Sequence, residues 1–374
     1  MTFPTAAPTA CLASTALTGV GQVAIRLVCR MGRLGRTVAR GGAAVLLAAL
    51  LMGTGAAMAQ VQAQPPDAEQ PQDVPRASSC PPLAQPVVRT AAEAAQALAH
   101  APDRGLLWRI ERGGRVSWLY GTLHLGRADW VFPGPRTLQA LQGSQTVALE
   151  LDLRDPATLA LLTTPPDAAR VARLRTADRV RRLERQVAAA CLPAGSFAGL
   201  GPVMQATTLV LLAARHEGLY GEFGTETLLS DVAHRDGKRV VALESAAAQL
   251  RALAGESEAA DAAQIDASLT LLESGAAWKQ AADMADAWAR SDWTHLSHYA
   301  DWCECMDTPT DRRAMRRLLD DRNPGLADGI ARLHARGQQV FAAVGALHMV
   351  GPHGLPALMA ARGFKVMPVV PAAH

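Results

Sequence analysis

The chain has 374 residues, of which 49% are hydrophobic and 19% are charged, so it is long enough to bury a core in one large domain or two. Residues 1–59 hold five of the 37 basic side chains and none of the 34 acidic ones, so the rest of the chain has 32 basic and 34 acidic side chains and a formal charge of −2. A balance this close to neutral gives no indication of a nucleic-acid-binding protein, and we expect no nucleic-acid partner.

The first 59 residues have the pattern of a signal peptide. Five arginines precede a short apolar run, Ala43–Met52, and Ala57-Met58-Ala59 supplies a small-x-small cleavage site before Gln60. Because the run is short for a membrane-spanning helix, we expect a soluble exported protein with no stable membrane anchor after cleavage. The basic lead is unusually long, which makes Met31 an alternative start.

Residues 60–86 are rich in Gln, Pro, Ala and Asp, and predict a flexible tether before a domain at 87–374. Four cysteines follow the leader: Cys80, Cys191, Cys303 and Cys305. An even number of cysteines in an exported protein favours structural disulfides, although their pairing stays undetermined. Cys303 and Cys305 could instead form a redox or metal pair, which is less favoured because no second cysteine pair has ligand spacing.

The domain begins with a predicted β-hairpin. Strands at 106–112 and 115–123 flank Gly113-Gly114, a strong two-residue turn signal. The second strand leads into His124. A loop with glycine and proline, an apolar-periodic helix and another strand follow, and this last strand ends at Glu150 in the sequence TVALELD.

Residues from about 155 to 336 are predicted to be mainly helical. One strand, 239–243, interrupts the helices and ends at Glu244. The last helix starts near Pro324, a favourable first-turn residue, with Asn323 as its expected N-cap. We therefore predict one α/β core with a largely helical insert, rather than two independent domains.

The strand that leads into His124 has a counterpart near the C-terminus. VSWLYGTLHLG at 116–126 matches VFAAVGALHMVG at 340–351: both have Val eight residues, Gly three residues and Leu one residue before the His. A loop, a helix and a strand follow each copy. The repeat predicts a central mixed sheet, built from two related strand–loop–helix–strand halves and flanked by helices. Each Gly-x-x-His is expected at a strand end, where α/β folds bind ligands and glycine permits a close approach.

His124 and His348 are therefore the leading candidates for chemistry, with a pair of satisfied core histidines as the alternative. Two neutral imidazoles supply two ligands for a divalent metal, and a carboxylate usually completes such a site. Glu150 is the expected carboxylate. Asp152 would face the same side if the strand continued to it, or could cap a helix.

Three further residues are candidates. Glu244 ends the strand VVALES, which resembles VALELD around Glu150. A role in capping the following helix is an almost equally favoured alternative. Glu226 could act as a ligand or base, or simply favour the positive end of a helix. Arg322 could bind an anion or stabilise a transition state.

Together these residues resemble the TraB/GumN family, which is related to the Tiki membrane-tethered proteases. The resemblance covers about residues 107–370 and is carried by YGTLHLG, the ELD after it, the stretch at 237–244, Arg322-Asn323 and VGALHMVG. It implies a divalent-metal hydrolase, with protease activity on the Tiki side, whose site uses His124, His348 and Glu150. A haem-binding lipoprotein family thought to share the fold implies a non-catalytic alternative.

The function that we expect is a metal-dependent hydrolase acting on peptide or protein substrates, and periplasmic if the organism is Gram-negative. Mn²⁺, Co²⁺ and Zn²⁺ all fit two imidazoles and a carboxylate. The alternative is an exported protein that binds haem or a peptide, or assists envelope assembly, through the same cleft without turnover. The oligomeric state stays undetermined.

Overall fold

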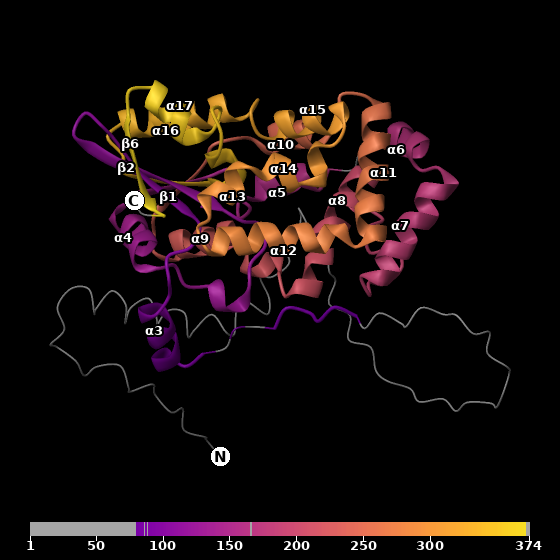
Figure 1. The fold of residues 1–374 in the computed structure, drawn as a ribbon, viewed down its shortest axis with the longest axis horizontal. Coiled ribbons are helices and arrows are strands. Elements are labelled where there is room, and N and C mark those ends of the chain that lie inside the picture. The colour runs from indigo at the N-terminus through magenta and orange to yellow at the C-terminus, as the bar shows by residue number, and fades with distance from the viewer. Residues whose placement is uncertain (1–79, 86, 88, 165–166, 372–374) are drawn as a thin grey trace, which may run out of the picture.

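The structure is a computed structural model that describes residues 80–85, 87, 89–164 and 167–371. The expected signal peptide and nearly all of the expected tether lie outside these residues. The described chain forms a sheet with helices on both faces, and a block of helices extends beyond one end of it (Figure 1). No helix in the described ranges is long and apolar enough to cross a bilayer.

The sheet has six strands in the order β4-β3-β5-β2-β1-β6. Strand β1 is antiparallel to both of its neighbours, whereas the pairs β2–β5, β5–β3 and β3–β4 are parallel. The predicted mixed sheet is therefore confirmed. Its strands are β1 (Leu106–Arg112), β2 (Arg115–Thr122), β3 (Thr146–Leu149), β4 (Arg239–Ala242), β5 (Val340–Gly345) and β6 (Lys365–Val370).

The predicted hairpin is the β1–β2 pair, which runs in register from Leu106↔Gly121 to Arg112↔Arg115. Gly113 and Gly114 have φ of 59° and 73° at its turn. A two-residue turn with positive φ at both positions matches the right-handed twist of the strands, and glycine adopts this conformation at little cost.

The two copies of the repeat lie side by side. Strand β2 pairs with β5 from Trp118↔Phe341 to Thr122↔Gly345, so both Gly-x-x-His segments leave the sheet at the same edge. After β2 the chain passes through α4 (Pro135–Gly143) to β3, and after β5 it passes through α17 (Leu355–Ala361) to β6, on the opposite side in the strand order. The two connections thus run in opposite directions across the sheet. In α/β folds, ligands bind outside the carboxyl ends of the strands where the direction of the connections changes.

Each face of the sheet has its own apolar core. On one face, α16 (Asn323–Ala335) and α17 contribute Leu326, Ile330, Leu355 and Met359. On the other, α4 and α9 (Thr225–Arg235) contribute Ala140, Leu141, Leu229 and Ala233. In Figure 1 these two layers lie above and below the strands.

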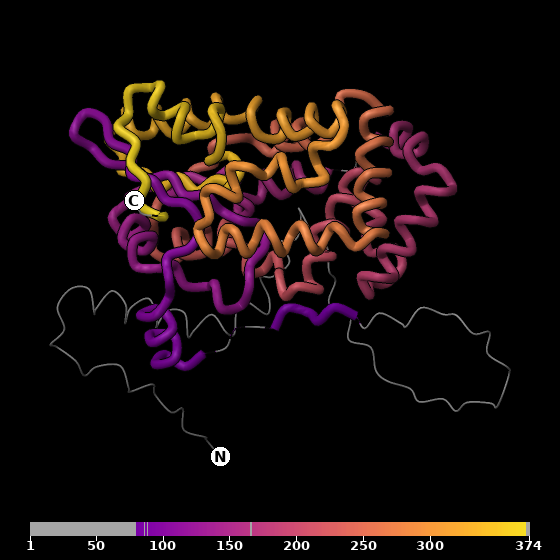
Figure 2. The backbone as a smooth tube through the Cα atoms, viewed as in Figure 1, coloured from indigo at the N-terminus to yellow at the C-terminus, as the bar shows by residue number. Residues whose placement is uncertain are grey.

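A third apolar core lies in the helical block. It contains Leu183 of α7, Leu209 of α8, and Ile265 and Leu269 of α11. These helices stand at the end of the molecule away from the hairpin (Figure 2).

The α-helices whose bounds have not yet been given are α3 (Ala91–Ala99), α5 (Pro156–Leu162), α6 (Ala168–Leu174), α7 (Ala177–Ala189), α8 (Pro202–Ala213), α10 (Ala246–Leu253), α11 (Glu258–Ser274), α12 (Ala276–Ala289), α13 (Trp293–Ser297), α14 (Tyr299–Trp302) and α15 (Pro309–Leu318). Short 3-10 helices are η3 (Ala128–Trp130), η4 (Ala214–Glu217), η5 (Gly221–Phe223), η6 (Glu304–Met306) and η7 (Ala346–Met349).

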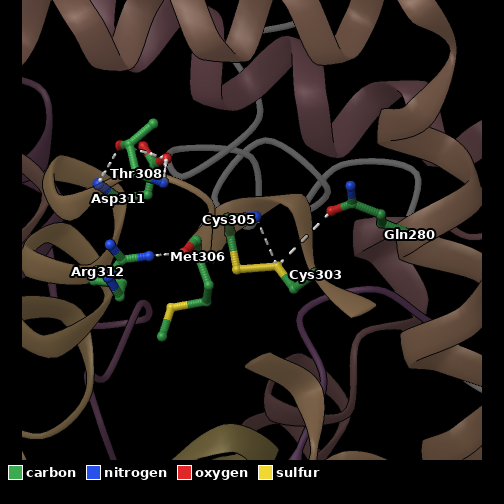
Figure 3. The surroundings of a disulfide bond; sticks show 7 residues. All are labelled: Gln280, Cys303, Cys305, Met306, Thr308, Asp311 and Arg312. Carbon is green, nitrogen blue, oxygen red and sulfur yellow. Dashed lines mark hydrogen bonds between the residues drawn. A yellow bond between two sulfur atoms is a disulfide. The ribbon is translucent and has the colours of Figure 1, made fainter. Parts of the chain in front are cut away.

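All four cysteines of the described residues form disulfides. Cys80 is bonded to Cys191, which ties the segment before α3 to the end of α7. Cys303 is bonded to Cys305 across one intervening residue, beside η6 (Figure 3). The expectation of disulfides is confirmed, and the structure supplies the pairing that the sequence left open.

Candidate functional site

The structure brings together six side chains at the carboxyl edge of the parallel strands. Each follows a strand or stands at the start of a helix: His124 after β2, Glu150 after β3, Glu244 after β4, His348 after β5, Glu226 in the first turn of α9, and Arg322 immediately before α16. We call this group the acid–histidine cluster. Its members are close enough for Glu150 and Arg322 to influence the pKa values of both histidines.

Glu150 is the buried centre of the cluster, with 5% of its surface exposed. One carboxylate oxygen, Oε1, accepts a hydrogen bond from the Gly345 backbone N–H at 2.8 Å. The other, Oε2, accepts from Arg322 Nη2 at 2.5 Å and from Gln249 Nε2 at 3.0 Å. Burial alone would raise the pKa of Glu150, but His348, Arg322 and His124 lower it to about 2. Glu150 is thus a carboxylate at neutral pH.

The glycine of the second motif allows this contact. A Cβ at Gly345 would stand 3.2 Å from Glu150 Oε1, closer than most side-chain contacts permit. The motif therefore needs glycine here because a backbone amide must approach a carboxylate of the neighbouring strand. The sequence did not indicate Gln249, since nothing local marks a residue of α10 as a partner of β3.

Arg322 joins two carboxylates. Besides its contact with Glu150, its Nε donates to Glu244 at 3.0 Å and 3.2 Å from the two carboxylate oxygens. Burial raises the pKa of Glu244, while the guanidinium acts against this rise. Arg322 also donates from Nη1 to the backbone oxygen of Leu318 at 2.8 Å, which fixes the guanidinium plane.

His348 is buried, and its protonation is determined by a chain of hydrogen bonds. The backbone oxygen of His353 can only accept, so Asn323 must direct its amide nitrogen there, at 2.8 Å. Asn323 Oδ1 then faces His348 Nδ1 at 2.6 Å, so Nδ1 carries the proton. Burial lowers the pKa of His348 to about 4, and the neutral ring keeps a lone pair on Nε2.

This arrangement corrects the expected role of Asn323. The sequence pattern predicted an N-cap, but α16 begins at Asn323 itself and no side chain caps the helix at Arg322. Asn323 is 1% exposed, and its amide binds His348 and His353 instead. Local capping preference is worth about 1 kcal/mol, and it is overridden here by burial that demands partners for both amide atoms.

His124 has a different environment, because 63% of its side chain is exposed. Its Nδ1 lies 2.8 Å from Glu226 Oε2, and Glu226 Oε1 accepts from Thr122 Oγ1 at 2.9 Å. The charge of Glu226 raises the pKa of His124 to about 9, against the opposing effect of desolvation. The rest of the segment is held closely: a Cβ at Gly224 would stand 2.3 Å from the backbone oxygen of His124.

Asp152 does not join the cluster. Strand β3 ends at Leu149, so the alternation that would have placed Asp152 beside Glu150 stops before it. Its carboxylate lies 3.3 Å from His234 Nε2 and accepts from the Arg154 backbone N–H at 3.0 Å. Asp152 therefore stabilises the chain after β3.

The donors of the cluster suit a metal in part. Each histidine directs Nδ1 to an oxygen of Glu226 or Asn323, a pattern common among metal-binding histidines, in which Nε2 is the ligand atom. Nε2 of His348, however, already accepts a hydrogen bond from Arg322 Nη1 at 3.3 Å. Both oxygens of Glu150 are already bonded, and His348 Nε2 is 3.9 Å from the nearer of them. Within the described parts of the chain, no group of three or more His, Cys, Asp or Glu has ligand spacing. Imidazole nitrogens are suitable donors for a divalent cation, but His348 and Glu150 could serve as ligands only by giving up contacts with Arg322 or Gln249.

Fold and site together define an α/β protein with a histidine–carboxylate–arginine cluster at the carboxyl ends of two repeated strands. The family model described as TraB/PrgY/gumN family matches residues 106–368, well over half of the chain. The chain therefore belongs to the TraB/PrgY/gumN family. No curated protein and no solved structure matches the chain significantly.

Proposed function

We propose that this protein is an exported metal-dependent hydrolase that cleaves peptide bonds, periplasmic if its organism is Gram-negative. The observation that carries the proposal is the pair of histidines at adjacent strand ends, each with Nδ1 directed to an oxygen, an orientation typical of metal-binding histidines. Nε2 of His348 accepts from Arg322 Nη1 at 3.3 Å, so a cation must displace this contact.

In this proposal His124 Nε2 and His348 Nε2 hold the cation, which can be Mn²⁺, Co²⁺ or Zn²⁺. When bound, such a cation supplies Lewis acidity that polarises a carbonyl group and acidifies water. The proton on His124 must leave first, so cation binding is expected to release protons. Glu226 and Asn323 orient the two rings.

The acidic residues have separate roles. Glu150, with a pKa near 2, is too weak a base to accept a proton at neutral pH and suits a ligand role. Glu244, whose pKa burial raises, is the better candidate to accept a proton. Arg322 contacts both carboxylates and is placed to stabilise negative charge that develops on a substrate oxygen.

One observation favours a second candidate function, a binding protein without turnover. Glu150 is saturated by Arg322, Gln249 and the Gly345 amide, and a positive guanidinium lies 3.3 Å from His348 Nε2. A site arranged in this way could hold an anionic group of haem or of a peptide.

A peptide library incubated with the purified mature protein distinguishes the two functions. We expect cleavage that a chelator abolishes and that Mn²⁺, Co²⁺ or Zn²⁺ restores, and His348→Ala should eliminate it. Absence of cleavage with every cation, together with a metal-free protein after purification, would contradict the hydrolase. Mass spectrometry of the exported chain should place its N-terminus near Gln60.

A further inference from the structure

A pocket on the α4 and α9 face of the sheet lies apart from the acid–histidine cluster. It contains about 650 Å³ of space not filled by protein atoms, part of which is open to solvent. We call it the Trp130 pocket. Its walls are mainly apolar and aromatic, and none of the six cluster residues lines it; they include Tyr120, Trp130, Phe132, Leu138, Leu229 and Trp288.

Arg104, whose guanidinium has no hydrogen-bonded partner among the described residues, lines these apolar walls. The Arg104 side chain is 14% exposed, and its carbon Cζ lies 5.8 Å from the centroid of the Trp130 ring. Its ion-pair partner, the exposed Asp129, is 3.9 Å away, which is beyond hydrogen-bond distance. Burial lowers the pKa of Arg104, and Asp129 offsets only part of this effect. A guanidinium desolvated in this way favours an anionic ligand.

A buried hydroxyl in the same wall also has no partner. Thr137 is 1% exposed, and its Oγ1 makes no hydrogen bond within the described residues. Its backbone N–H is occupied, because Asp103 Oδ1 accepts from it and from the N–H of Arg136. An unpaired buried hydroxyl lowers the stability of the fold, and a ligand hydrogen bond would remove that cost.

We propose that the Trp130 pocket binds a small amphiphilic carboxylate, such as a medium-chain fatty acid. The apolar body of the ligand packs among Trp130, Leu229 and Trp288, and its carboxylate binds Arg104, with Thr137 Oγ1 as a second donor. Asp103 does not compete, because two backbone amides already bind its carboxylate. This site is independent of the proposed hydrolase, although Thr225 of its wall precedes Glu226, the partner of His124.

Calorimetric titration of the mature protein at pH 7.5 with octanoate and with 1-octanol tests the proposal, since the two compounds share a chain and differ in charge. We expect octanoate to bind at least tenfold more tightly, about 1.4 kcal/mol. Arg104→Met should remove this difference while keeping the apolar stem. Asp129→Asn should tighten octanoate binding several-fold, because it leaves the guanidinium to the ligand.

Thr137→Val and Arg136→Met complete the test. Thr137→Val should lower the affinity for octanoate several-fold without lowering the melting temperature, because the hydroxyl has no partner to lose. This variant also tests the site if Arg104→Met does not fold. Arg136 is an exposed arginine of the same helix that does not line the pocket, so Arg136→Met should leave the affinity unchanged. Equal affinity for octanoate and octanol, no octanoate binding at millimolar concentration, or equal losses in Arg104→Met and Arg136→Met would each overturn the proposal.

Discussion

Asn323 Oδ1 lies 2.6 Å from Nδ1 of His348, which follows the second of the two repeated strands. The same amide is anchored by the backbone carbonyl of His353. The first residue of a helix and a residue just after a strand thus act as one unit. The backbone determines the orientation of the amide, and the amide determines the tautomer of the ring.

Asn323→Ala is expected to lower the affinity for a divalent cation about 10- to 100-fold, because the His348 ring loses the acceptor that orients it. Metal titration followed by calorimetry measures the loss, and circular dichroism checks the fold. Asn323→Asp keeps an acceptor for Nδ1 and should retain more affinity than the alanine variant. Wild-type affinity in a folded Asn323→Ala protein would show that this contact does not orient a ligand.

His124→Ala and His348→Ala should each remove most of the bound metal, and the double variant should lose little more than either alone. A site with one imidazole cannot compete with water for the cation, so the two losses are strongly non-additive. Metal content and melting temperature are measured on the three proteins. Full metal content in His124→Ala, with only a lower melting temperature, would contradict a shared site.

Glu150→Gln and Glu226→Gln should differ in stability. A glutamine at 150 must direct its amide nitrogen at either the Gly345 N–H or the donors Arg322 and Gln249, so we expect a loss of roughly 3 kcal/mol of unfolding free energy or more. A glutamine at 226 can keep its oxygen on His124 and donate to Thr122, and should be nearly neutral. Urea unfolding compares them, and equal losses would refute this explanation.

Glu226→Gln has a second consequence. Because the Glu226 charge raises the pKa of His124 to about 9, the substitution should lower that pKa towards 6.5, the ordinary value. Stability from the raised pKa is complete below pH 6.5 and is lost as the pH rises through 9, but the exposed ring makes it small. Titration of the His124 ring protons by NMR measures the shift, and an unchanged pKa would exclude Glu226 as its cause.

Acid should destabilise the metal-free protein in two steps. The pKa of His348 is about 4 in the folded protein against 6.5 in the unfolded chain, so the unfolded state takes up the proton first and stability falls from pH 6.5 to 4. The pKa of Glu150 is about 2 against 4.5, so its contribution is present above pH 4.5 and is lost as the pH falls to 2. Melting temperatures from pH 8 to 3 check this. His348→Gln should reduce the fall in melting temperature between pH 6.5 and 4. If the melting temperature of this variant depends on pH as in the wild type, that fall is caused by other groups.

The two disulfides should contribute unequally to stability. Cys80 and Cys191 are 111 residues apart, so their bond restricts a long loop of the unfolded chain and should contribute about 4–5 kcal/mol. Cys303 and Cys305 are two residues apart, and their bond restricts very little. The paired serine variants, Cys80→Ser with Cys191→Ser and Cys303→Ser with Cys305→Ser, are compared by urea unfolding. A larger loss in the second pair would reverse this assignment.

The sequence by itself determined the features whose causes are local. Gly113-Gly114 specifies the hairpin because few other residues accept positive φ at both turn positions, and the repeated Gly-x-x-His predicted a mixed sheet with both histidines at one edge. The acidic strand ends at Glu150 and Glu244 could be recognised in the same way, since a strand end is visible in the alternation of its residues.

Only the tertiary structure decided which residues meet. Gln249 binds Glu150, Glu226 binds His124 and Asn323 binds His348, across separations of 99, 102 and 25 residues. Local rules misplaced Asn323 as a helix cap, and they left open whether β3 continues to Asp152, because they do not include burial. A buried polar atom must find a partner wherever the folded chain supplies one, and that requirement selects contacts that no short stretch of sequence encodes.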